Sequence, residues 1–394
     1  MSRTLLFNPE NDLALAAGTP NYTPPLAARR LRDAGCTLPL WYSSAGDRVI
    51  THGVNARWFD TMTELFGLQA DLYDHRSATS LTPSPWGWSA AARRNFINEN
   101  FDPSQLPDDT LIEHLRQLSH RRTAIEINRR LRDLLDFEIA PEAVEIDNPA
   151  TLADLLVQDS DMVIKAPWSS TGRGIIDCRT LRPDEVMRHA SGIISRQGSV
   201  MAEHAYDRLA DFAMLFHSDG GHCRFAGLSL FDTDPRGAYT GNIIAPQNYL
   251  ADCLAAIYPA ERLTATAAAL EQVLSEVISP LYSGPLGVDM LIADRDDGRP
   301  SLLDATVELN LRRTMGFVAL SLAENYIAEG STGHYAVIPG AVSADSQAVV
   351  ESHKLVSGRI LLTEPNPYFS FVFEAQPVGC LLYTSPSPRD YAAS

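Results

Sequence analysis

Two carboxylates and an amide are spaced so that one face of a β-hairpin would present all three. Asp289 precedes a turn at residues 296–298, and Glu308 and Asn310 follow that turn. Side chains two residues apart on a strand share a face, so Glu308 and Asn310 point the same way. A hairpin that turns near Gly298 places Asp289 opposite Glu308, and the three polar groups then converge.

Converging carboxylates repel each other unless a cation lies between them. Mg²⁺ prefers oxygen ligands, and proteins commonly hold it with one or two carboxylates together with substrate phosphates. Asp289, Glu308 and Asn310 are therefore candidate metal ligands. Asp304 shares a strand face with Glu308 unless a bulge intervenes, which makes it a rival ligand. The alternative is a solvated sheet face on which a carboxylate pairs with Arg312.

A second stretch, residues 163–175, combines an apolar strand that ends in Lys165 with a loop of small and hydroxyl side chains. Backbone N–H groups of such a loop can approach phosphate oxygens, and the lysine adds positive charge. The lysine precedes the glycines, so the loop is not a Walker A motif, and a strand follows where a dinucleotide-binding fingerprint requires a helix. A flexible turn between strands is the alternative. The candidate phosphate-binding loop comprises Ser169, Ser170, Thr171, Gly172, Arg173 and Gly174.

Together, the two stretches resemble the ATP-grasp superfamily, over about residues 119–326. In that superfamily a strand lysine and a Gly-rich loop cover the triphosphate, and a glutamate ends the strand at the hinge between subdomains. A later aspartate and an E-x-N-x-R run hold Mg²⁺ and the phosphates. Phe7–Ala14 and Asn21–Pro25 also look like the start of uncharacterised ATP-grasp proteins of Bacteroidetes type. The resemblance implies an α/β fold in which an N-terminal α/β domain precedes the ATP-grasp domain, with ATP and Mg²⁺ as cofactors.

The resemblance also assigns charge-stabilising roles to basic residues. Lys165 and Arg312 would stabilise the negative charge that develops during phosphoryl transfer. Arg121 or Arg122 resembles an additional cation that contacts the phosphates in some members of the superfamily, and we favour Arg122.

Three further residues would surround the nucleoside. By the same resemblance, Glu203 and the backbone through Ala205 would face adenine, and Asp211 would bind the ribose hydroxyls. The implied activity is that of a carboxylate–amine ligase, in which ATP phosphorylates a carboxylate and an amine or thiol then displaces phosphate. The expected partners are small-molecule substrates that carry a carboxylate or an amine.

Three other functions are compatible with parts of the sequence. A phosphotransferase on the same fold would leave a stable phosphorylated product. A non-catalytic nucleotide-binding module would have a decayed site, whereas Asp289, Glu308, Asn310 and Arg312 are all present. An unrelated α/β sugar-nucleotide enzyme would need a helix after the glycines.

Alternating short strands and helices near the N-terminus predict a small α/β domain before the nucleotide site. Within this part, Leu38–Tyr42 is predicted to be a strand, and Thr110–Leu135 is predicted to be one helical stretch. The expected division of the chain is an N-terminal domain over residues 1–118, an ATP-grasp domain over 119–330 with its nucleotide-binding lid at about 150–210, and a truncated C-terminal segment over 331–379.

The 394-residue chain has a net charge of −17 and five scattered cysteines without CxxC spacing. The acidic balance argues against nucleic acid or an anionic membrane as the main partner. The cysteine spacing indicates neither a zinc site nor a disulfide framework. The N-terminal apolar run is too short for a signal peptide, and no apolar stretch approaches the ~20 residues of a membrane span. We therefore expect a cytoplasmic enzyme.

The end of the sequence carries a resemblance of another kind. Cys380–Asp390 resembles a translated sequencing-library adapter, and the stretch after Tyr383 is rich in Ser and Pro with no helix or strand period. We expect residues 380–394 to be a non-native tail that packs against nothing, and the native chain to continue differently after about Gly379.

Overall fold

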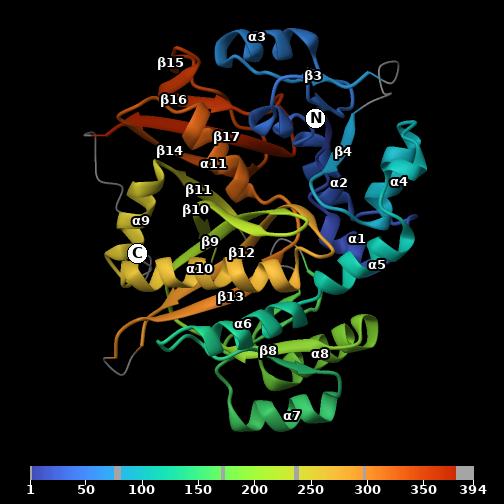
Figure 1. Ribbon diagram of the computed structural model, residues 1–394, viewed down its shortest axis with the longest axis vertical. Coiled ribbons are helices and arrows are strands. Elements are labelled where there is room, and N and C mark those ends of the chain that lie inside the picture. The colour runs from blue at the N-terminus through green and yellow to red at the C-terminus, as the bar shows by residue number, and fades with distance from the viewer. Residues whose placement is uncertain (1, 75–80, 170–173, 235–238, 296–298, 379–394) are drawn as a thin grey trace.

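The computed structural model describes residues 2–74, 81–169, 174–234, 239–295 and 299–378. These residues form three β-sheets with helices packed on them, which confirms the expected α/β class with an N-terminal α/β domain (Figure 1). Ser170 to Arg173 of the predicted phosphate-binding loop and the predicted tail of residues 380–394 lie outside the described residues.

The N-terminal part of the chain folds as a parallel sheet surrounded by helices. Its elements are β1 (Arg3–Leu6), α1 (Asn11–Ala17), α2 (Leu26–Ala34), the 3-10 helix η1 (Leu38–Tyr42), β2 (Arg48–Val49), α3 (Ala56–Phe66), β3 (Asp71–Leu72), β4 (Thr82–Pro85), α4 (Ala90–Asn98), the 3-10 helix η3 (Pro103–Gln105) and α5 (Asp109–Leu118). The strand order is β3-β2-β1-β4. From the carboxyl end of β1 the chain enters α1, which ends at Gly18 in a left-handed conformation (φ 61°) that glycine adopts without strain.

One predicted strand of this part is wrong. Leu38–Tyr42 forms the 3-10 helix η1, in which Leu38, Pro39, Leu40 and Trp41 are all buried. A short buried apolar run is compatible with either structure. Pro39 decides against the strand, because it has no N–H for a ladder hydrogen bond and its fixed φ suits the first turn of a helix.

A small antiparallel sheet follows in the middle of the chain. Its elements are β5 (Val144–Ile146), α7 (Pro149–Gln158), β6 (Met162–Lys165), β7 (Ile175–Asp177), α8 (Pro183–Gln197) and β8 (Val200–His204). The strand order is β5-β8-β6-β7, and the two helices share a hydrophobic core with the sheet. The Asn148 side chain caps the start of α7, since it accepts a hydrogen bond from the Ala150 N–H (2.8 Å).

The largest sheet has nine strands and carries helices on both faces. Its elements are α6 (Arg122–Leu134), β9 (Arg208–Asp219), β10 (Cys223–Thr233), β11 (Tyr239–Ile244), α9 (Gln247–Ala255), α10 (Ala260–Val277), β12 (Ser283–Ala293), β13 (Leu302–Asn310), α11 (Met315–Asn325), β14 (Ser331–Pro339), β15 (Val349–Glu351), β16 (Lys354–Leu361) and β17 (Phe369–Pro377). The strand order is β13-β12-β9-β10-β11-β14-β17-β16-β15. The stretch predicted as one helix from Thr110 to Leu135 is two helices, α5 and α6, with a break at residues 119–121.

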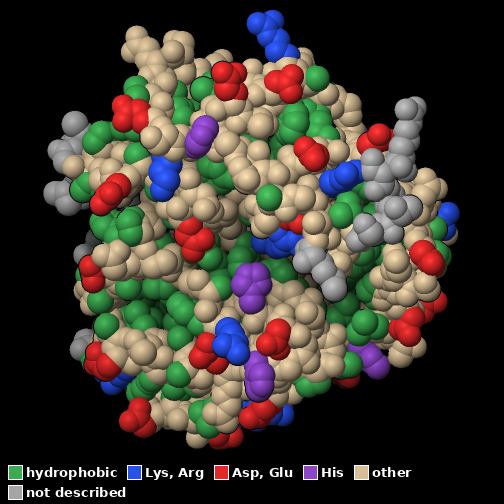
Figure 2. Space-filling model, turned by 45° about the horizontal axis from the view of Figure 1, so that its top comes forward, with side chains coloured by type: hydrophobic (Ala, Val, Ile, Leu, Met, Phe, Trp, Pro, Cys, Tyr) green, Lys and Arg blue, Asp and Glu red, His purple; other side chains and the backbone are tan. Residues whose placement is uncertain are grey.

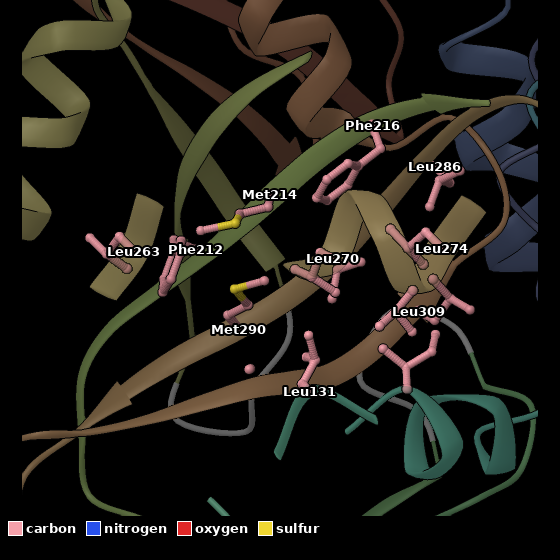
Figure 3. Close-up of a cluster of buried hydrophobic side chains, with 14 of the residues drawn as sticks. Leu131, Phe212, Met214, Phe216, Leu263, Leu270, Leu274, Leu286, Met290 and Leu309 are labelled. Atoms are coloured by element: carbon pink, nitrogen blue, oxygen red, sulfur yellow. The ribbon is translucent and has the colours of Figure 1, made fainter. Parts of the chain in front are cut away.

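A hydrophobic core fills the space between α6, α10 and the strands β9, β12 and β13 (Figure 3). Val288 pairs with Met214 across the sheet, and both are buried in this core with Leu270 of α10. Alternation along the strands turns the next pair, Asp289 and Ala213, to the opposite face. The polar side chains of β12 therefore lie on the face of the sheet that points away from α10.

Strands from the C-terminal part of the chain share a core with the N-terminal part. The rings of Phe7 and Phe371 meet edge to face with centroids 6.0 Å apart, in a cluster that also contains Trp41. The Trp41 Nε1–H donates a hydrogen bond to the Leu362 carbonyl (2.6 Å). The N-terminal part is thus held against the β14–β17 end of the nine-stranded sheet (Figure 1).

The surface reflects the acidic composition. Figure 2 shows one face on which Asp and Glu side chains are spread around the periphery, while basic and histidine side chains lie beside a hollow near its centre. Within the described part of the chain, none of the helices combines the length and apolar character needed to span a bilayer.

Candidate active site

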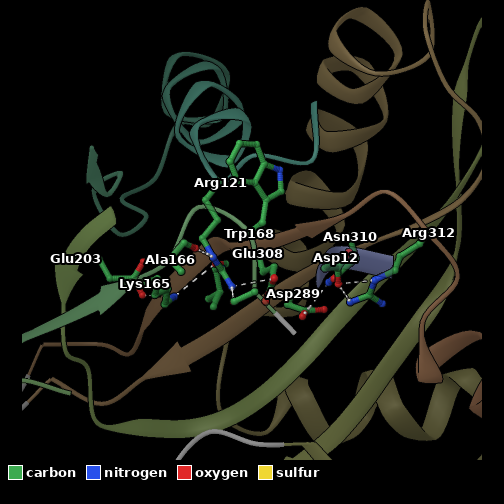
Figure 4. Close-up of polar contacts among 12 residues, drawn as sticks. Asp12, Arg121, Lys165, Ala166, Trp168, Glu203, Asp289, Glu308, Asn310 and Arg312 are labelled. Carbon is green, nitrogen blue, oxygen red and sulfur yellow. Dashed lines mark hydrogen bonds and ion pairs between the residues drawn. The ribbon is translucent and has the colours of Figure 1, made fainter. Parts of the chain in front are cut away.

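The carboxylate pair predicted from the sequence lies on the β12–β13 hairpin. Asp289 pairs directly with Glu308 across the hairpin, which confirms the predicted register. The Asn310 Nδ2 group donates a hydrogen bond to Asp289 Oδ2 (3.0 Å). The two carboxylates and the amide therefore lie together on the face of the sheet that points away from α10 (Figure 4).

The charge of Asp289 is poorly solvated. Burial, together with the neighbouring charge of Glu308, raises the pKa of Asp289 to about 7. Arg312, the hydrogen bond from Asn310 and the more distant Arg121 oppose this rise without cancelling it. A cation between the two carboxylates would remove their repulsion.

A bulge separates Asp304 from this pair. From Asp304 to Glu308, β13 advances by four residues while β12 advances by two. Asp304 is buried, and burial together with the charge of Glu203 raises its pKa to about 7, whereas Lys165 lowers it. Asp304 is therefore grouped with Lys165 and Glu203.

Lys165 reaches from the small sheet to the nine-stranded sheet. It is the last residue of β6 and is 5% exposed. Its Nζ forms an ion pair with Glu203 of β8 and donates to the Val307 carbonyl of β13 at 3.5 Å. Met201 lies opposite Lys165 in the ladder, so Glu203, two residues further along β8, is a diagonal neighbour on the same face.

Arg121 lies at the break between α5 and α6 and connects three parts of the site. Its guanidinium pairs with Glu308 (2.9 Å) and donates hydrogen bonds to the Ser169 hydroxyl (2.9 Å) and the Ala166 carbonyl (3.0 Å). The side chain is 7% exposed. Arg121 thus joins the end of β6 to the metal-ligand candidates on β13.

Arg122, the arginine favoured from the sequence, lies elsewhere. Its guanidinium pairs with Glu145 of β5 (2.6 Å), and its side chain is 53% exposed. Of the two neighbours, the structure therefore places Arg121 beside Glu308. The difference follows from the helix break, because consecutive residues at a helix start point in different directions.

Arg312 pairs with Asp12, which no sequence argument singled out. Two guanidinium nitrogens of Arg312 lie 2.7 and 2.8 Å from Asp12 Oδ2. Burial disfavours both charges. For Asp12 burial prevails over the attraction of Arg312, so the pKa of Asp12 is raised. For Arg312 the combined negative charges of Asp12, Glu308 and Asp289 outweigh burial, so the pKa of Arg312 is raised as well. Asp12 follows the carboxyl end of the parallel strand β1, the edge where binding residues of such sheets collect, and this position was the available signal.

The loop predicted to bind phosphates, residues 169–174, is described only at its two ends, Ser169 and Gly174. The Ala166 N–H donates to the Gly174 carbonyl (2.8 Å), which closes the base of the β6–β7 hairpin. Gly174 has a φ of 85°, and a Cβ added there would lie 2.9 Å from the Ala166 Cβ. Ser169 contributes a hydroxyl to Arg121, as described above.

The residues expected around the nucleoside lie along β8 and β9. Ala205 is buried, and its N–H donates to the Asp161 carbonyl (2.8 Å). A cavity of about 410 Å³ opens beside Ala205. Asp211 accepts a hydrogen bond from the Thr233 hydroxyl (3.0 Å) and pairs with Arg208 (3.3 Å).

These side chains form a line of acidic and basic groups between the small sheet and the hairpin, which we call the charged row. Figure 4 shows it running from Glu203 and Lys165 at one end to Asp12 and Arg312 at the other. The charged row consists of Glu203, Lys165, Asp304, Arg121, Glu308, Asp289, Asn310, Arg312 and Asp12. It contains five carboxylates and three cations, which amounts to an excess of two negative charges when every carboxylate is ionised.

No protein-family model matches the chain, and no curated protein matches it. Several solved structures have a similar chain trace. Biotin carboxylase of Campylobacter jejuni, in a β-γ-ATP complex, has a TM-score of 0.49 and 10% identity over 95% of this chain and 87% of that chain. N5-carboxyaminoimidazole ribonucleotide synthetase of Thermus thermophilus has a TM-score of 0.49 and 14% identity over 94% of this chain and 92% of that chain. At these identities the likeness concerns the chain trace alone.

Proposed function

We propose that this chain is a Mg-ATP-dependent ligase of the ATP-grasp type, which joins a carboxylate to an amine through an acylphosphate. The observation that carries the proposal is the charged row. It brings a strand lysine, a buried and a partly buried arginine and a pair of carboxylates to one face of a sheet, beneath a second, smaller sheet.

The charged row suits a polyphosphate that arrives with a divalent cation. Lys165, Arg121 and Arg312 supply three positive groups along one line, and each already has a carboxylate neighbour. The row by itself has two negative charges in excess, so a polyanion alone would add repulsion. One Mg²⁺ would offset that excess, since phosphates and carboxylates can share it.

The residues present fit a Mg²⁺ ion. Asp289 and Glu308 offer carboxylate oxygens, and Asn310 keeps its amide oxygen free for a metal because its Nδ2 donates to Asp289. The raised pKa of Asp289 marks a carboxylate that a cation would relieve. Among the described residues, no group of three or more His, Cys, Asp and Glu side chains is arranged as a complete metal site. A partial ligand set is what Mg²⁺ shared with phosphates requires.

In the proposed reaction, a substrate carboxylate oxygen attacks the γ-phosphorus of ATP, and the bond from that phosphorus to the β–γ bridging oxygen breaks. The products are an acylphosphate and ADP. The amine nitrogen then attacks the acyl carbon, the carbon–oxygen bond to phosphate breaks, and the amine loses a proton. Lys165, Arg121 and Arg312 neutralise charge on the transferred group, and bound Mg²⁺ would add charge neutralisation at the phosphates.

The proposal also divides the chain. Residues 119–330 form the ATP-grasp domain, with residues 150–210 as the lid over the phosphates, after an N-terminal domain of residues 1–118. Glu203 and the backbone through Ala205 face adenine, and Asp211 faces the ribose. Residues 331–379 form the C-terminal segment.

Nucleotide binding can be tested with the lysines, because the chain has two, Lys165 and Lys354. An ATP analogue with an acyl phosphate in place of the γ-phosphate acylates lysines close to the phosphates. We expect labelling of Lys165, blocked by excess MgATP, and none at Lys354, which serves as the internal control. Equal labelling of both lysines, unaffected by MgATP, would contradict the proposal.

The ligase step has an isotopic signature. A pool of carboxylates labelled with ¹⁸O, incubated with amines, ATP and Mg²⁺, should release phosphate that contains one ¹⁸O atom, because the carboxylate oxygen leaves with the phosphoryl group. Formation of ADP and a stable phosphorylated compound without free phosphate would instead indicate a phosphotransferase. Nucleotide binding without any ADP formation across the pool would favour a non-catalytic module.

A further inference from the structure

A second cavity, of about 540 Å³, lies beside Arg313, the neighbour of Arg312. Its walls include Tyr42 of η1, His217 of β9 and Phe317 of α11. The two neighbouring arginines point to different places: Arg312 faces Asp12, and Arg313 faces this cavity.

Arg313 is a buried cation without a counter-charge. It is 7% exposed, and its guanidinium carbon lies 4.2 Å from the ring centroid of Tyr42 and 5.6 Å from that of Phe317. Its guanidinium has no ion-pair or hydrogen-bond partner in the described part of the chain. Each cation of the charged row, by contrast, has a carboxylate neighbour. Arg313 is therefore placed for a partner that the protein itself does not provide.

The charge of Arg313 persists despite its unfavourable surroundings. Burial lowers the pKa of Arg313, and Tyr42 opposes that shift only in part. Arginine nevertheless keeps its proton in proteins, so the cavity holds a permanent positive charge. Contact with the tyrosine ring stabilises that charge to some extent, and a bound anion would stabilise it much more, since unpaired buried charges are costly.

Neighbouring charged groups do not neutralise the cavity. Glu324 lines it but is exposed at the end of α11. Arg3 lies close enough to act on Arg313 electrostatically, and it is already paired with Asp47 (2.5 Å). The balance at the floor of the cavity therefore stays positive.

We propose that this cavity binds a small organic oxyanion, a carboxylate or a phosphate monoester, with its charged end against Arg313 and its apolar part against Phe317 and Leu320. The planar guanidinium presents paired N–H donors that match two oxygens of such a group. A volume of about 540 Å³ is in the range of small-molecule sites.

This site is separate from the charged row. His217 is four residues along β9 from Ala213, the partner of Asp289, a distance of about 13 Å at 3.3 Å per residue. Thr314 packs over Gly287 between the two places, since a Cβ added at Gly287 would lie 3.2 Å from Thr314 Cγ2. Oxyanion binding at Arg313 therefore does not depend on the proposed nucleotide site and is tested without nucleotide.

Calorimetric titration at constant ionic strength with benzoate, phenyl phosphate and neutral benzamide tests the proposal. We expect at least one of the two anions to bind with one site per chain, and benzamide to bind much more weakly. Arg313→Met keeps an unbranched chain between Tyr42 and Phe317 and should weaken anion binding by about tenfold or more, the loss expected for a charge-assisted hydrogen bond. Whether benzoate or phenyl phosphate binds identifies the source of the oxyanion.

Arg30→Met is the matched control, because Arg30 also stacks on a tyrosine, Tyr368, at 3.8 Å. It should leave the affinities unchanged. Equal affinities in wild type and Arg313→Met, or no binding of either anion, would overturn the proposal. If Arg313→Met does not fold, wild-type crystals soaked in selenate decide: an anomalous peak at the Arg313 guanidinium supports the site, and peaks only elsewhere refute it.

Discussion

Several carboxylates of the charged row are buried or lie beside a like charge, and a bound cation would relieve both effects. Burial and a like charge raise the pKa of Asp289, and burial raises that of Asp12 even beside Arg312. Residues in such strained electrostatic positions reduce stability and are kept for activity. Replacing one of these carboxylates with a neutral side chain should therefore raise the stability of the fold and reduce ligand binding.

Asp289→Asn should raise thermal stability at pH 8 and abolish the stabilisation by Mg²⁺ with ATP. The pKa of Asp289 is about 7 in the folded chain and near 3.8 when exposed, so the folded state retains a proton that the unfolded state releases between these values. Wild-type stability then falls as pH rises from about 4 to 7. Asp289→Asn has no carboxyl group to titrate and does not lose this stability. At pH 8 its free energy of unfolding should exceed that of the wild type by on the order of 1 kcal/mol or more, and near pH 4 the difference should vanish.

Asp304→Asn is the matched control for this prediction, because burial and Glu203 also raise the pKa of Asp304 to about 7. It should gain stability in the same pH range and retain the Mg²⁺-dependent shift. Melting curves at pH 4, 6 and 8, with and without Mg²⁺ and ATP, measure both effects. Loss of the shift in Asp304→Asn alone would make Asp304 the metal ligand in place of Asp289.

The two neighbouring arginines give a second residue-scale prediction. Arg121→Met should weaken ATP binding at least about tenfold, because it removes a cation that contacts both Ser169 and Glu308. Arg122→Met should leave ATP affinity within about twofold, since Arg122 pairs with Glu145 on an exposed surface. Equilibrium binding of a fluorescent ATP analogue compares the two, and equal losses would contradict the assignment.

At the scale of the elements, local irregularities in helices and strands set the directions of the side chains in the charged row. The break at residues 119–121 turns Arg121 towards β6, and the bulge in β13 moves Asp304 away from Glu308. Gly174, directly before β7, has a positive φ, and an added Cβ there would meet Ala166. Irregular positions in otherwise regular elements are thus the sites where substitutions should affect ligand binding most.

Gly174→Ala should weaken ATP binding, because a methyl group there would lie 2.9 Å from the Ala166 Cβ and at a φ of 85° that alanine rarely adopts. Gly198→Ala at the end of α8 is the matched control, since Gly198 has a φ of 91° but no atom within 4 Å of an added Cβ. Both variants should lose about 1 kcal/mol of stability. Only Gly174→Ala should lose ATP affinity, and equal affinities would remove the β6–β7 hairpin from the site.

The start of α6 predicts a pH dependence of stability. Burial, with help from the positive charge of Arg122, lowers the pKa of His120 to about 4, and its Nδ1 accepts the Arg122 N–H (3.1 Å). Between about pH 6.5 and 4, His120 therefore binds a proton in the unfolded state but not in the folded state. The stability that neutral His120 allows is fully present above pH 6.5 and is lost as the pH falls to 4.

His120→Gln should remove that loss, which has a slope of at most about 1.4 kcal/mol per pH unit. Urea unfolding at pH 7, 5.5 and 4.5 measures it as the difference between wild type and variant. His189→Gln, on the exposed side of α8, should leave the profile unchanged. Parallel profiles for wild type and His120→Gln would show that the pKa of His120 is the same in the folded and unfolded chain, and would contradict the prediction.

Elements whose signals are local could be predicted from the sequence, and those set by distant contacts could not. The pairing of Asp289 with Glu308 could be predicted from strand alternation and the turn that the sequence predicts near Gly298. The helix break before Arg122 has no proline or glycine to mark it. Asp12 lies 300 residues from Arg312 in the sequence, so only the folded chain shows that they pair.

At the scale of the molecule, contacts between the N-terminal part and the C-terminal part join two ends of the chain. Phe7 of the N-terminal part packs on Phe371 of β17, and Trp41 bonds to Leu362. This shared core fixes the N-terminal part, which carries Asp12, against the nine-stranded sheet, which carries Arg312. Stability and the alignment of the charged row are therefore coupled over the whole chain.

Phe371→Ala should lower the free energy of unfolding by about 3–5 kcal/mol, because Phe371 is completely buried. Urea unfolding followed by tryptophan fluorescence should show a single transition, since Trp41 belongs to the same core. Phe225→Ala, at a ring that is 39% exposed, should cost much less. Separate transitions for the N-terminal part and the nine-stranded sheet would contradict a shared core.

The ion pair between Asp12 and Arg312 has a consequence for the newborn protein. At a synthesis rate of roughly 5–20 residues per second, Arg312 emerges about 15–60 s after Asp12, from which it is 300 residues distant. During that interval Asp12 lacks the ion pair with Arg312. The core of the N-terminal part also remains incomplete until β17 has been synthesised. A chain that has been translated only as far as residue 311 therefore has an incomplete charged row, because the ion pair at its end forms only after Arg312 has emerged.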